Sequence, residues 1–391
     1  MPAMPQLLIT VFVALVSLSL LTGAACTDDV LTETVDDEVV IDRVESEEAT
    51  FRVVKLVSGL EHPWAVAWLP DGAKLITERP GRLNLMQNGE ITEISGLPAI
   101  EARGQGGLLD VALHPEYEEN GWIYFAYSAP GDGGTGTALA RAQLDGTELV
   151  DLEVLYEQDP KHRAGRHYGS RIVFPGDGTV VFTIGDRGQR NLAQVFDDAS
   201  GSTIRLNYDG SIPEDNPFVG NDDYLPEMLT VGNRNAQGMI VHPETGAIWQ
   251  HEHGPRGGDE LNLMQPGENY GWPEATYGTE YRDDSPIGVD PDETDEFVHP
   301  ITHWTPSIAP SGLAYYDGDA FPGWQGNLFV GALAFQQINR VVLEGNEVVH
   351  EEVLLDNELG RIRDVRTGPD GLIYILTDQS DGGLFRIEPV E

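Results

Sequence analysis

The sequence predicts an all-β fold, a six-bladed β-propeller of four-stranded blades. The chain has 391 residues with 45 glycines and 25 prolines, a composition that implies many turns and few long helices. A turn followed by a β-rich run recurs six times, and the first two copies are 45 residues apart. That spacing matches a four-stranded propeller blade, which takes roughly 40 to 50 residues.

Each copy begins with a turn that contains Pro or Gly and continues into β-branched and aromatic residues. In order the copies are LPDGAKLITER, HPEYEENGWIYFAYS, FPGDGTVVFTIGD, HPETGAIWQHEHG, FPGWQGNLFVGAL and GPDGLIYILTD. Their prolines are Pro70, Pro115, Pro175, Pro243, Pro322 and Pro369. Six copies predict six blades, with the longer spacings taken up by loop insertions. A pair of β-sandwiches is the alternative, which one motif repeated six times disfavours.

The N-terminal segment predicts export. Residues 1–25 are interpreted as a signal peptide of lipoprotein type, because an apolar run precedes Cys26. We expect a periplasmic or other extracytoplasmic protein that is anchored through a lipidated Cys26; a signal peptide without lipid or an uncleaved anchor are the alternatives. The single cysteine excludes an internal disulfide. Residues 26–50 predict an acidic disordered tether, and residues 51–391 the catalytic propeller.

The charge of the chain excludes some partners. A net charge of −42 arises from 65 acidic and 23 basic residues, so nucleic acid and anionic membrane surfaces are poor partners. The segment Asp283 to Glu296 holds seven of the acids. It is interpreted as a solvated insertion, with a cation-binding loop as the alternative.

The third copy carries a candidate catalytic pair. His167 precedes a strand predicted over residues 171–174, and Asp186 follows a strand predicted over residues 179–184. A Pro-Gly-Asp-Gly turn joins the two strands, so both side chains should meet at one rim of the sheet. A carboxylate beside an imidazole fixes its tautomer and makes it a better base. Alternatively, His167 caps a turn and Asp186 binds backbone amides.

Three glycine-rich clusters suggest a ligand site. Gln105 in GQGGLLD offers an amide in a loop that a ligand can approach closely. Arg234 in GNRNAQG suggests an anionic ligand, because its fork matches a carboxylate. In GRIRD, Arg361 and Arg363 share one strand face, where two like charges require an anion. A structural ion pair with one of the many acids is the alternative for Arg234.

A fourth cluster suggests calcium. HGPRGGDE begins at His253 and is followed by NYGWP, and carboxylates with carbonyls in a Gly/Pro-rich loop suit a hard cation. The His and Cys spacing of a zinc site is absent from the sequence. A capped turn is the alternative. A base, arginines and calcium together suit a small polyanionic cofactor with a redox task.

These motifs, in this order, resemble the soluble quinoprotein glucose/sorbosone (aldose sugar) dehydrogenases over roughly residues 53–387. The resemblance implies a six-bladed propeller that binds pyrroloquinoline quinone (PQQ) and calcium. It implies oxidation of an aldose at C1 to the lactone, with hydride transfer to the quinone and electrons passed to an external acceptor. A homodimer is a further possibility.

The resemblance also implies roles for single residues. His167 would be the general base and Asp186 would orient it. The positions that match cofactor contacts are Gln105, His167, Arg234, Asn235, Arg361 and Arg363. Gly254 and Pro255 match backbone ligands of the activating calcium, and Glu260 and Tyr270 match a second, structural calcium site.

Two positions depart from the family pattern. Ala334 lies where soluble glucose enzymes place a lysine on the cofactor, and Arg166 replaces an aspartate just before the histidine. Two other functions therefore stay open: a calcium-dependent propeller lactonase or hydrolase, and a non-catalytic propeller that binds sugar or protein.

Overall fold

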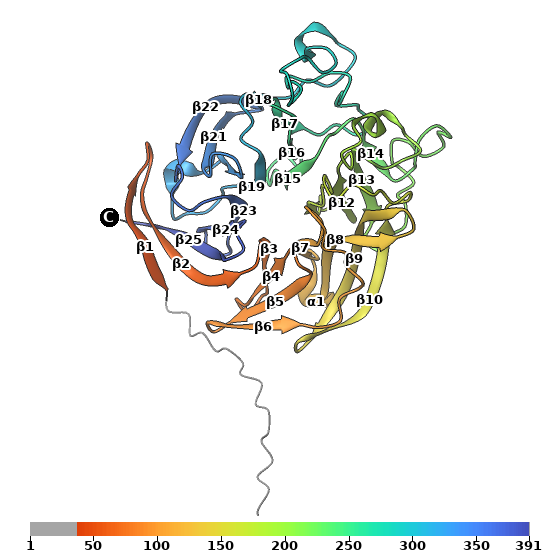
Figure 1. Cartoon of the computed structure of the whole chain (residues 1–391). Coiled ribbons are helices and arrows are strands. Elements are labelled where there is room, and N and C mark those ends of the chain that lie inside the picture. Colours follow the sequence, from red (N-terminus) through yellow and green to blue (C-terminus); the bar gives the residue numbers. More distant parts are fainter. Residues whose placement is uncertain (1–36, 391) are drawn as a thin grey trace, which may run out of the picture. The chain divides into compact units, whose positions relative to one another are not determined.

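A computed structural model describes residues 37–390, and its six sheets form a ring around a central axis (Figure 1). The predicted six-bladed β-propeller is therefore confirmed. The predicted signal peptide and Cys26 lie outside the described residues. Within residues 37–390 no helix is long and apolar enough to cross a membrane.

Blades 1 to 3 each have four antiparallel strands. Blade 1 contains β3 (Pro63–Trp68), β4 (Lys74–Glu78), β5 (Arg82–Gln87) and β6 (Glu90–Ile94). Blade 2 contains β7 (Leu108–Leu113), β8 (Trp122–Gly131), β9 (Gly134–Asp145) and β10 (Glu148–Glu157), with the short helix α1 (Tyr117–Asn120). Blade 3 contains β11 (Ile172–Val173), β12 (Thr179–Ile184), β13 (Ser202–Asn207) and β14 (Met228–Thr230), with the 3-10 helix η1 (Arg190–Gln194).

Blades 4 to 6 complete the ring. Blade 4 contains β15 (Ala236–Val241), β16 (Ile248–Glu252), β17 (Asp259–Leu263) and β18 (Thr302–Trp304), with η2 (Pro291–Glu293). Blade 5 contains β19 (Pro310–Tyr315), β20 (Leu328–Ala332), β21 (Ile338–Glu344) and β22 (Glu347–Leu354), with η3 (Pro322–Trp324). Blade 6 contains β23 (Ile362–Thr367), β24 (Ile373–Thr377), β25 (Gly382–Pro389), β2 (Thr50–Leu60) and β1 (Glu38–Glu45).

The six proline-containing turns occupy the same place in every blade. Each lies between the first and second strand, from Pro70 between β3 and β4 to Pro369 between β23 and β24. The first strands of neighbouring blades contact one another around the axis. The start of each first strand and the end of each second strand therefore lie at the opposite mouth of the ring from these turns.

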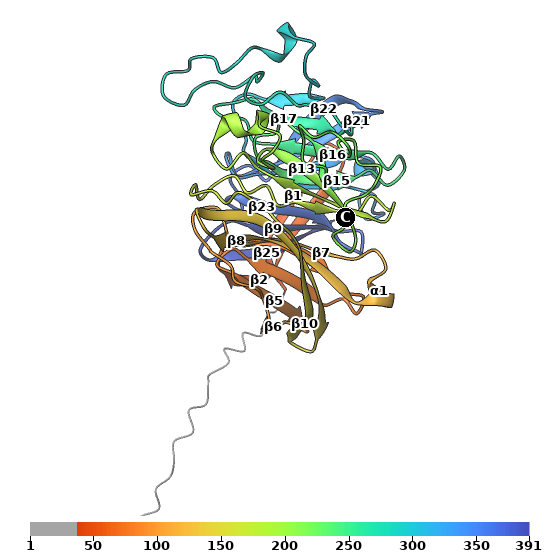
Figure 2. The ribbon, with the colours of Figure 1, turned by 90° about the vertical axis from the view of Figure 1, so that its right-hand side faces the viewer.

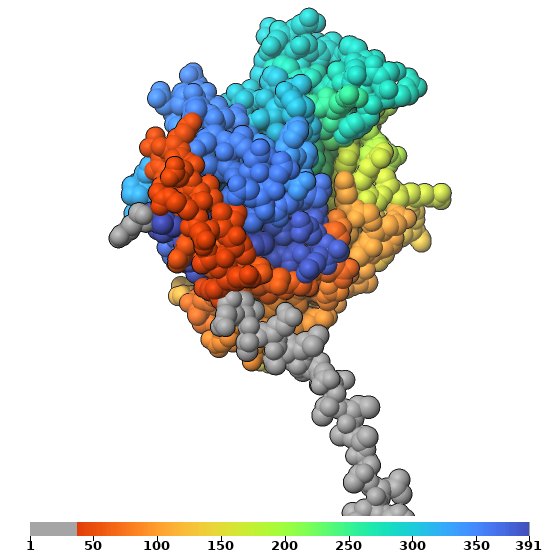
Figure 3. Space-filling view, turned by 60° about the vertical axis from the view of Figure 1, so that its left-hand side comes forward, coloured from red at the N-terminus to blue at the C-terminus, as the bar shows by residue number. Residues whose placement is uncertain are grey.

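The last blade is closed by the N-terminal part of the chain. Strand β2 pairs with β25, with Phe51 opposite Pro389, and Figure 3 shows these two ends of the described chain side by side. The predicted disordered tether is wrong for residues 38–45, which form β1 against β2. The reason is that Ile41 and Val44 pack against a hydrophobic core, while the acids of this strand face solvent.

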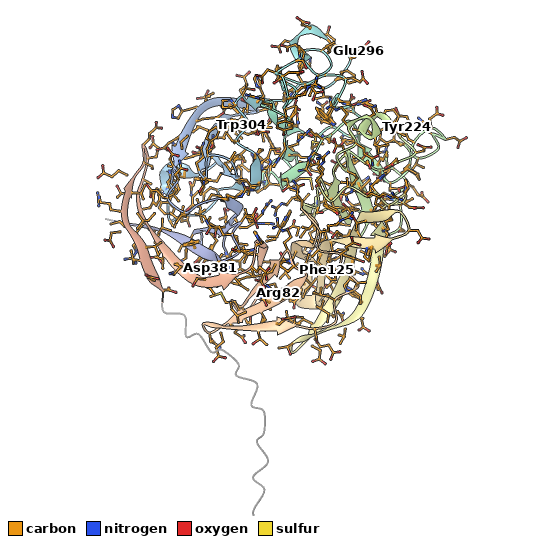
Figure 4. The ribbon with its side chains drawn as sticks, viewed as in Figure 1. Arg82, Phe125, Tyr224, Glu296, Trp304 and Asp381 are labelled. Atoms are coloured by element: carbon orange, nitrogen blue, oxygen red, sulfur yellow. The ribbon has the colours of Figure 1, made fainter. Side chains whose placement is uncertain are left out.

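Blade 4 carries the largest insertion, between β17 and β18, and it projects from the ring in both Figures 1 and 2. Figure 4 shows Glu296 at its outer end. All seven acids from Asp283 to Glu296 are exposed. No group of three or more His, Cys, Asp or Glu side chains arranged for a metal is found in the described part of the chain.

Candidate active site

The predicted site residues converge on one mouth of the ring. His167, Arg234 and Arg361 each stand shortly before the first strand of a blade. Asp186 and Gly254 each lie two residues after the last residue of a second strand, β12 and β16 respectively. These two positions meet at the mouth opposite the proline turns. Side chains that end in nitrogen gather near the axis in Figure 4.

His167 and Asp186 are in contact, as their spacing in the sequence predicts. His167 Nδ1 lies 2.6 Å from Asp186 Oδ1, and the side chains are only 12% and 2% exposed. An ionised carboxylate can only accept hydrogen bonds, so Asp186 places the imidazole proton on Nδ1. Nε2 is then the basic nitrogen, and His167 lines a cavity.

Asp186 is held by two further donors. Trp272 Nε1 donates to Oδ2 at 2.9 Å and the Gly188 amide donates to Oδ1 at 2.6 Å. A Cβ atom at Gly185 would lie 2.5 Å from the His167 carbonyl oxygen, so glycine permits the close approach of the two loops. Sequence reasoning gave Trp272 no role, because it reaches Asp186 from another blade.

The protonation states of His167 and Asp186 suit a general base and the carboxylate that orients it. Burial disfavours the charged imidazole, and with the nearby Arg234 it lowers the pKa of His167 despite the hydrogen bond that His167 donates to Asp186. Burial alone would raise the pKa of Asp186, but the hydrogen bond from His167 and the charge of Arg234 outweigh it and lower that pKa. At neutral pH the histidine is therefore neutral and the aspartate is ionised.

The loop that carries His167 is fixed by side chains from other loops. His167 has a φ of 54°, a left-handed conformation that is uncommon for residues other than glycine. Its amide donates to Gln105 Oε1 at 2.7 Å. The buried Arg187 donates to the carbonyls of Arg166, His167 and Ala164 at 2.5, 2.9 and 2.9 Å. Gln105 therefore positions the base, and Arg187 is a positioning residue that the sequence did not reveal.

The cavity beside His167 has a volume of about 350 Å³. Its other lining residues are Arg166, Asp186, Gly188, Arg190, Arg234, Pro255, Trp272, Glu280 and Tyr281. Arg190 forms a two-point ion pair with Glu280, with distances of 2.7 and 3.1 Å. Blades 3 and 4 therefore meet at the rim of this cavity.

A second cavity of about 220 Å³ lies next to the first. Tyr168 and Asn235 line it, while their neighbours His167 and Arg234 line the first cavity. Gln105 and His253 also line it, and His253 Nε2 lies 2.6 Å from the Pro310 carbonyl oxygen. The predicted cofactor positions are therefore divided between two neighbouring cavities.

Arg361 and Arg363 both line the second cavity, as their alternation in a strand predicts. The carboxylate of Asp378 is the anion that pairs with these two arginines. Asp378 Oδ2 accepts from Arg363 at 2.8 Å and from Arg361 at 3.4 Å. Burial opposes ionisation of Asp378, but Arg363 and neighbouring cations outweigh it and hold its pKa well below the usual range. The expectation that these arginines require an external anion is therefore corrected in part.

Another cation lies next to Ala334, the position without the family lysine. Arg361 Nη1 donates to the carbonyl of Leu333 at 3.2 Å, directly before Ala334, and Arg79 also lines this cavity. Neither contact was foreseen from the sequence. The cavity therefore keeps three guanidinium groups although the lysine is missing.

Four charged side chains join the innermost strands. Arg171 Nη1 lies 3.2 Å from Asp110 and 3.1 Å from Asp364, and Arg366 lies 2.7 and 2.8 Å from the same two carboxylates. Both aspartates are fully buried. Arg171 also lies over the ring of Trp64, which lines the second cavity. We call these four residues the axial ion cluster.

Two buried carboxylates mark a possible cation site. Glu252 and Glu260 are opposite each other on β16 and β17, and burial raises the pKa of Glu260 well above its usual range, with the charge of Glu252 adding to it. The buried Asn262 Oδ1 has no hydrogen-bond partner. Tyr270 lies at the same small cavity. Its hydroxyl accepts from the Gln265 amide and donates to the Leu263 carbonyl, both at 2.8 Å, so the hydroxyl is not free to bind a cation.

Comparison with known proteins identifies the family. The sequence model described as Glucose / Sorbosone dehydrogenase matches residues 60–386. The aldose sugar dehydrogenase YliI of Escherichia coli (strain K12) is 42% identical over 351 residues, which cover 87% of this chain and 94% of that protein.

Solved structures agree. A crystal structure of a glucose dehydrogenase is 44% identical with a TM-score of 0.84, and the match covers 86% of this chain and 99% of that one. A PQQ-bound aldose sugar dehydrogenase from Streptomyces coelicolor is 25% identical with a TM-score of 0.71, covering 87% and 98%. The chain therefore belongs to the glucose/sorbosone dehydrogenase family.

Proposed function

We propose that this protein oxidises an aldose at C1 to the lactone, with PQQ as cofactor and an external electron acceptor. The observation that carries the proposal is the His167–Asp186 pair, whose histidine lines a cavity beside an arginine-lined one. The named activities of relatives, among them an aldose sugar dehydrogenase and a PQQ-bound structure, support it.

His167 acts as the base in this proposal. Its Nε2 takes the proton of the anomeric hydroxyl, and Asp186 stabilises the imidazolium that forms. Trp272 and Gly188 keep Asp186 in place through their hydrogen bonds. PQQ, when bound, supplies the quinone that accepts the hydride.

The residues of the two cavities fit PQQ. The first cavity, of about 350 Å³, is in the range of small-molecule sites, roughly 300 to 1,000 Å³, and the second adds about 220 Å³ next to it. The buried Nε of Arg363 has no partner in the protein, and Arg361 is about half exposed, at 48%. Arg234, Asn235, Arg361 and Arg363 would hold the carboxylates and oxygens of the cofactor.

Two calcium sites fit the chain as well. The Gly254 amide donates to Asp259 Oδ1 at 2.8 Å, which fixes the loop whose Gly254 and Pro255 carbonyls would bind an activating calcium. Glu260 and the Tyr270 carbonyl would bind a structural calcium, since hard cations prefer oxygen ligands. A divalent cation there would offset the repulsion between Glu252 and Glu260.

Removing calcium is expected to lower the melting temperature by several degrees, because the buried carboxylates then lose their counter-charge. Thermal unfolding with calcium and with a chelator measures this shift. Glu260→Gln should reduce the calcium-dependent shift, whereas Glu268→Gln, an exposed neighbour, should retain it in full. A full shift in Glu260→Gln would contradict the assignment of this site.

The function is tested with purified protein that is mixed with PQQ and calcium. Reduction of an artificial dye is followed on adding aldoses, and we expect turnover that requires both additions. No turnover together with no bound quinone would overturn the proposal and favour a non-catalytic propeller. Lactone hydrolysis without dye reduction would favour the hydrolase alternative.

A further inference from the structure

Most arginines of this acidic protein have an acidic partner. The chain has 65 acidic residues against 23 basic ones, so an arginine without a carboxylate is unusual. In residues 37–390, four arginines have no carboxylate oxygen within 4.0 Å. They are Arg163, Arg166, Arg187 and Arg234.

Arg166 differs from the other three. Arg187 is buried and donates to several carbonyls, and Arg234 donates to the His253 carbonyl at 2.9 Å and lies over Trp272. Arg163 and Arg166 are both exposed, but Arg163 lines neither cavity. Arg166 lines the His167 cavity, and its guanidinium has only a weak bond of 3.4 Å, to the carbonyl of Gly188.

The place of Arg166 is defined by its neighbours. A Cβ atom at Gly188 would lie 2.1 Å from Arg166 Nε, so the side chain rests across Gly188, whose amide binds Asp186. The other cation of the cavity rim, Arg190, is neutralised by Glu280. Two guanidinium groups of the cavity in which His167 would act on the sugar therefore lack a carboxylate: Arg234, which is assigned above to the cofactor, and Arg166 at the rim.

We propose that Arg166 binds a carboxylate on the substrate, so that the preferred substrates are aldoses that carry an acid group, of the hexuronic acid class. This inference rests on the proposed function. A guanidinium fork binds a carboxylate through two parallel hydrogen bonds. The strongly acidic remainder of the protein repels anions, so a local cation is required to hold one at the base.

The first test compares sugars that differ only in the acid group: glucuronic acid with glucose, and galacturonic acid with galactose. We expect kcat/KM with PQQ, calcium and dye to favour the acids by about tenfold or more, the size of one charge-assisted hydrogen bond. Arg166→Gln should lower this ratio about tenfold, mainly through KM for the acids. Arg163→Gln is the matched control on the same loop and should keep the ratio.

The second test measures binding without oxidation. Methyl glucuronide and methyl glucoside are blocked at C1 and should act as competitive inhibitors. The glucuronide should bind about tenfold more tightly to the wild type, and Arg166→Gln should remove this preference. Preference for neutral sugars, or equal ratios in wild type and Arg166→Gln, would overturn the inference and leave the proposed function intact. No dye reduction with any sugar and no bound PQQ would overturn both.

Discussion

Replacing His167 by glutamine is expected to lower kcat by about 10²- to 10⁴-fold, the range of general-base catalysis, while PQQ stays bound. Glutamine can still donate a hydrogen bond to Asp186 but cannot accept the substrate proton at neutral pH. Stopped-flow dye reduction measures turnover, and the absorbance of protein-bound quinone measures cofactor retention. Near-normal turnover in His167→Gln would show that another group is the base.

The chain contains a matched control for this change. His162 and Asp198 form a second buried His–Asp pair, 3.1 Å apart, which lines neither site cavity. His162→Gln should retain kcat within a few-fold. The pH profile adds a second criterion: the neutral imidazole is active, and its pKa is lowered. In the wild type kcat/KM should therefore decline only below about pH 6.5, the ordinary value for histidine.

Arg171→Met is expected to reduce the free energy of unfolding by about 3–5 kcal/mol, because breaking a buried ion pair leaves uncompensated charge. Arg171 is 2% exposed and contacts both aspartates of the axial ion cluster. After its removal, Arg366 alone faces two buried carboxylates. Urea unfolding followed by tryptophan fluorescence measures the change.

An exposed pair provides the comparison. Arg282 lies 2.7 Å from Asp283, with side chains 90% and 42% exposed. Arg282→Met should change the free energy of unfolding by less than about 1 kcal/mol, since surface ion pairs contribute little. Equal losses in Arg171→Met and Arg282→Met would mean that the axial ion cluster does not stabilise the ring.

Local spacing in the sequence predicted much of the fold and one contact of the site. The strand expected over residues 179–184 is β12 itself, and the strand expected over residues 171–174 is present in shorter form as β11. The PGDG turn brings His167 to Asp186 because the strands of a hairpin share a rim. Contacts of this kind need only a turn and a strand period, both of which are visible in the chain.

Contacts between blades could not be predicted in the same way. Trp272 reaches Asp186 from 86 residues away, and Asp110 of blade 2 reaches Arg366 of blade 6 from 256 residues away. Strand β1 was missed because its acids suggested a solvated tether, whereas Ile41 and Val44 pack against a core that blades 5 and 6 form together. In each case the partner is determined by the closed ring and not by the local pattern.

The pairing of β2 with β25 has a consequence for folding during synthesis of the chain. Phe51 can pair with Pro389 only after Pro389 has been synthesised, so synthesis of nearly the whole chain precedes completion of the last blade. Contacts between such distant residues form slowly, because chain entropy is lost before they contribute stability. A ribosome-bound or C-terminally shortened chain would expose the edges of β2 and β24 together, a surface open to strand pairing with other molecules.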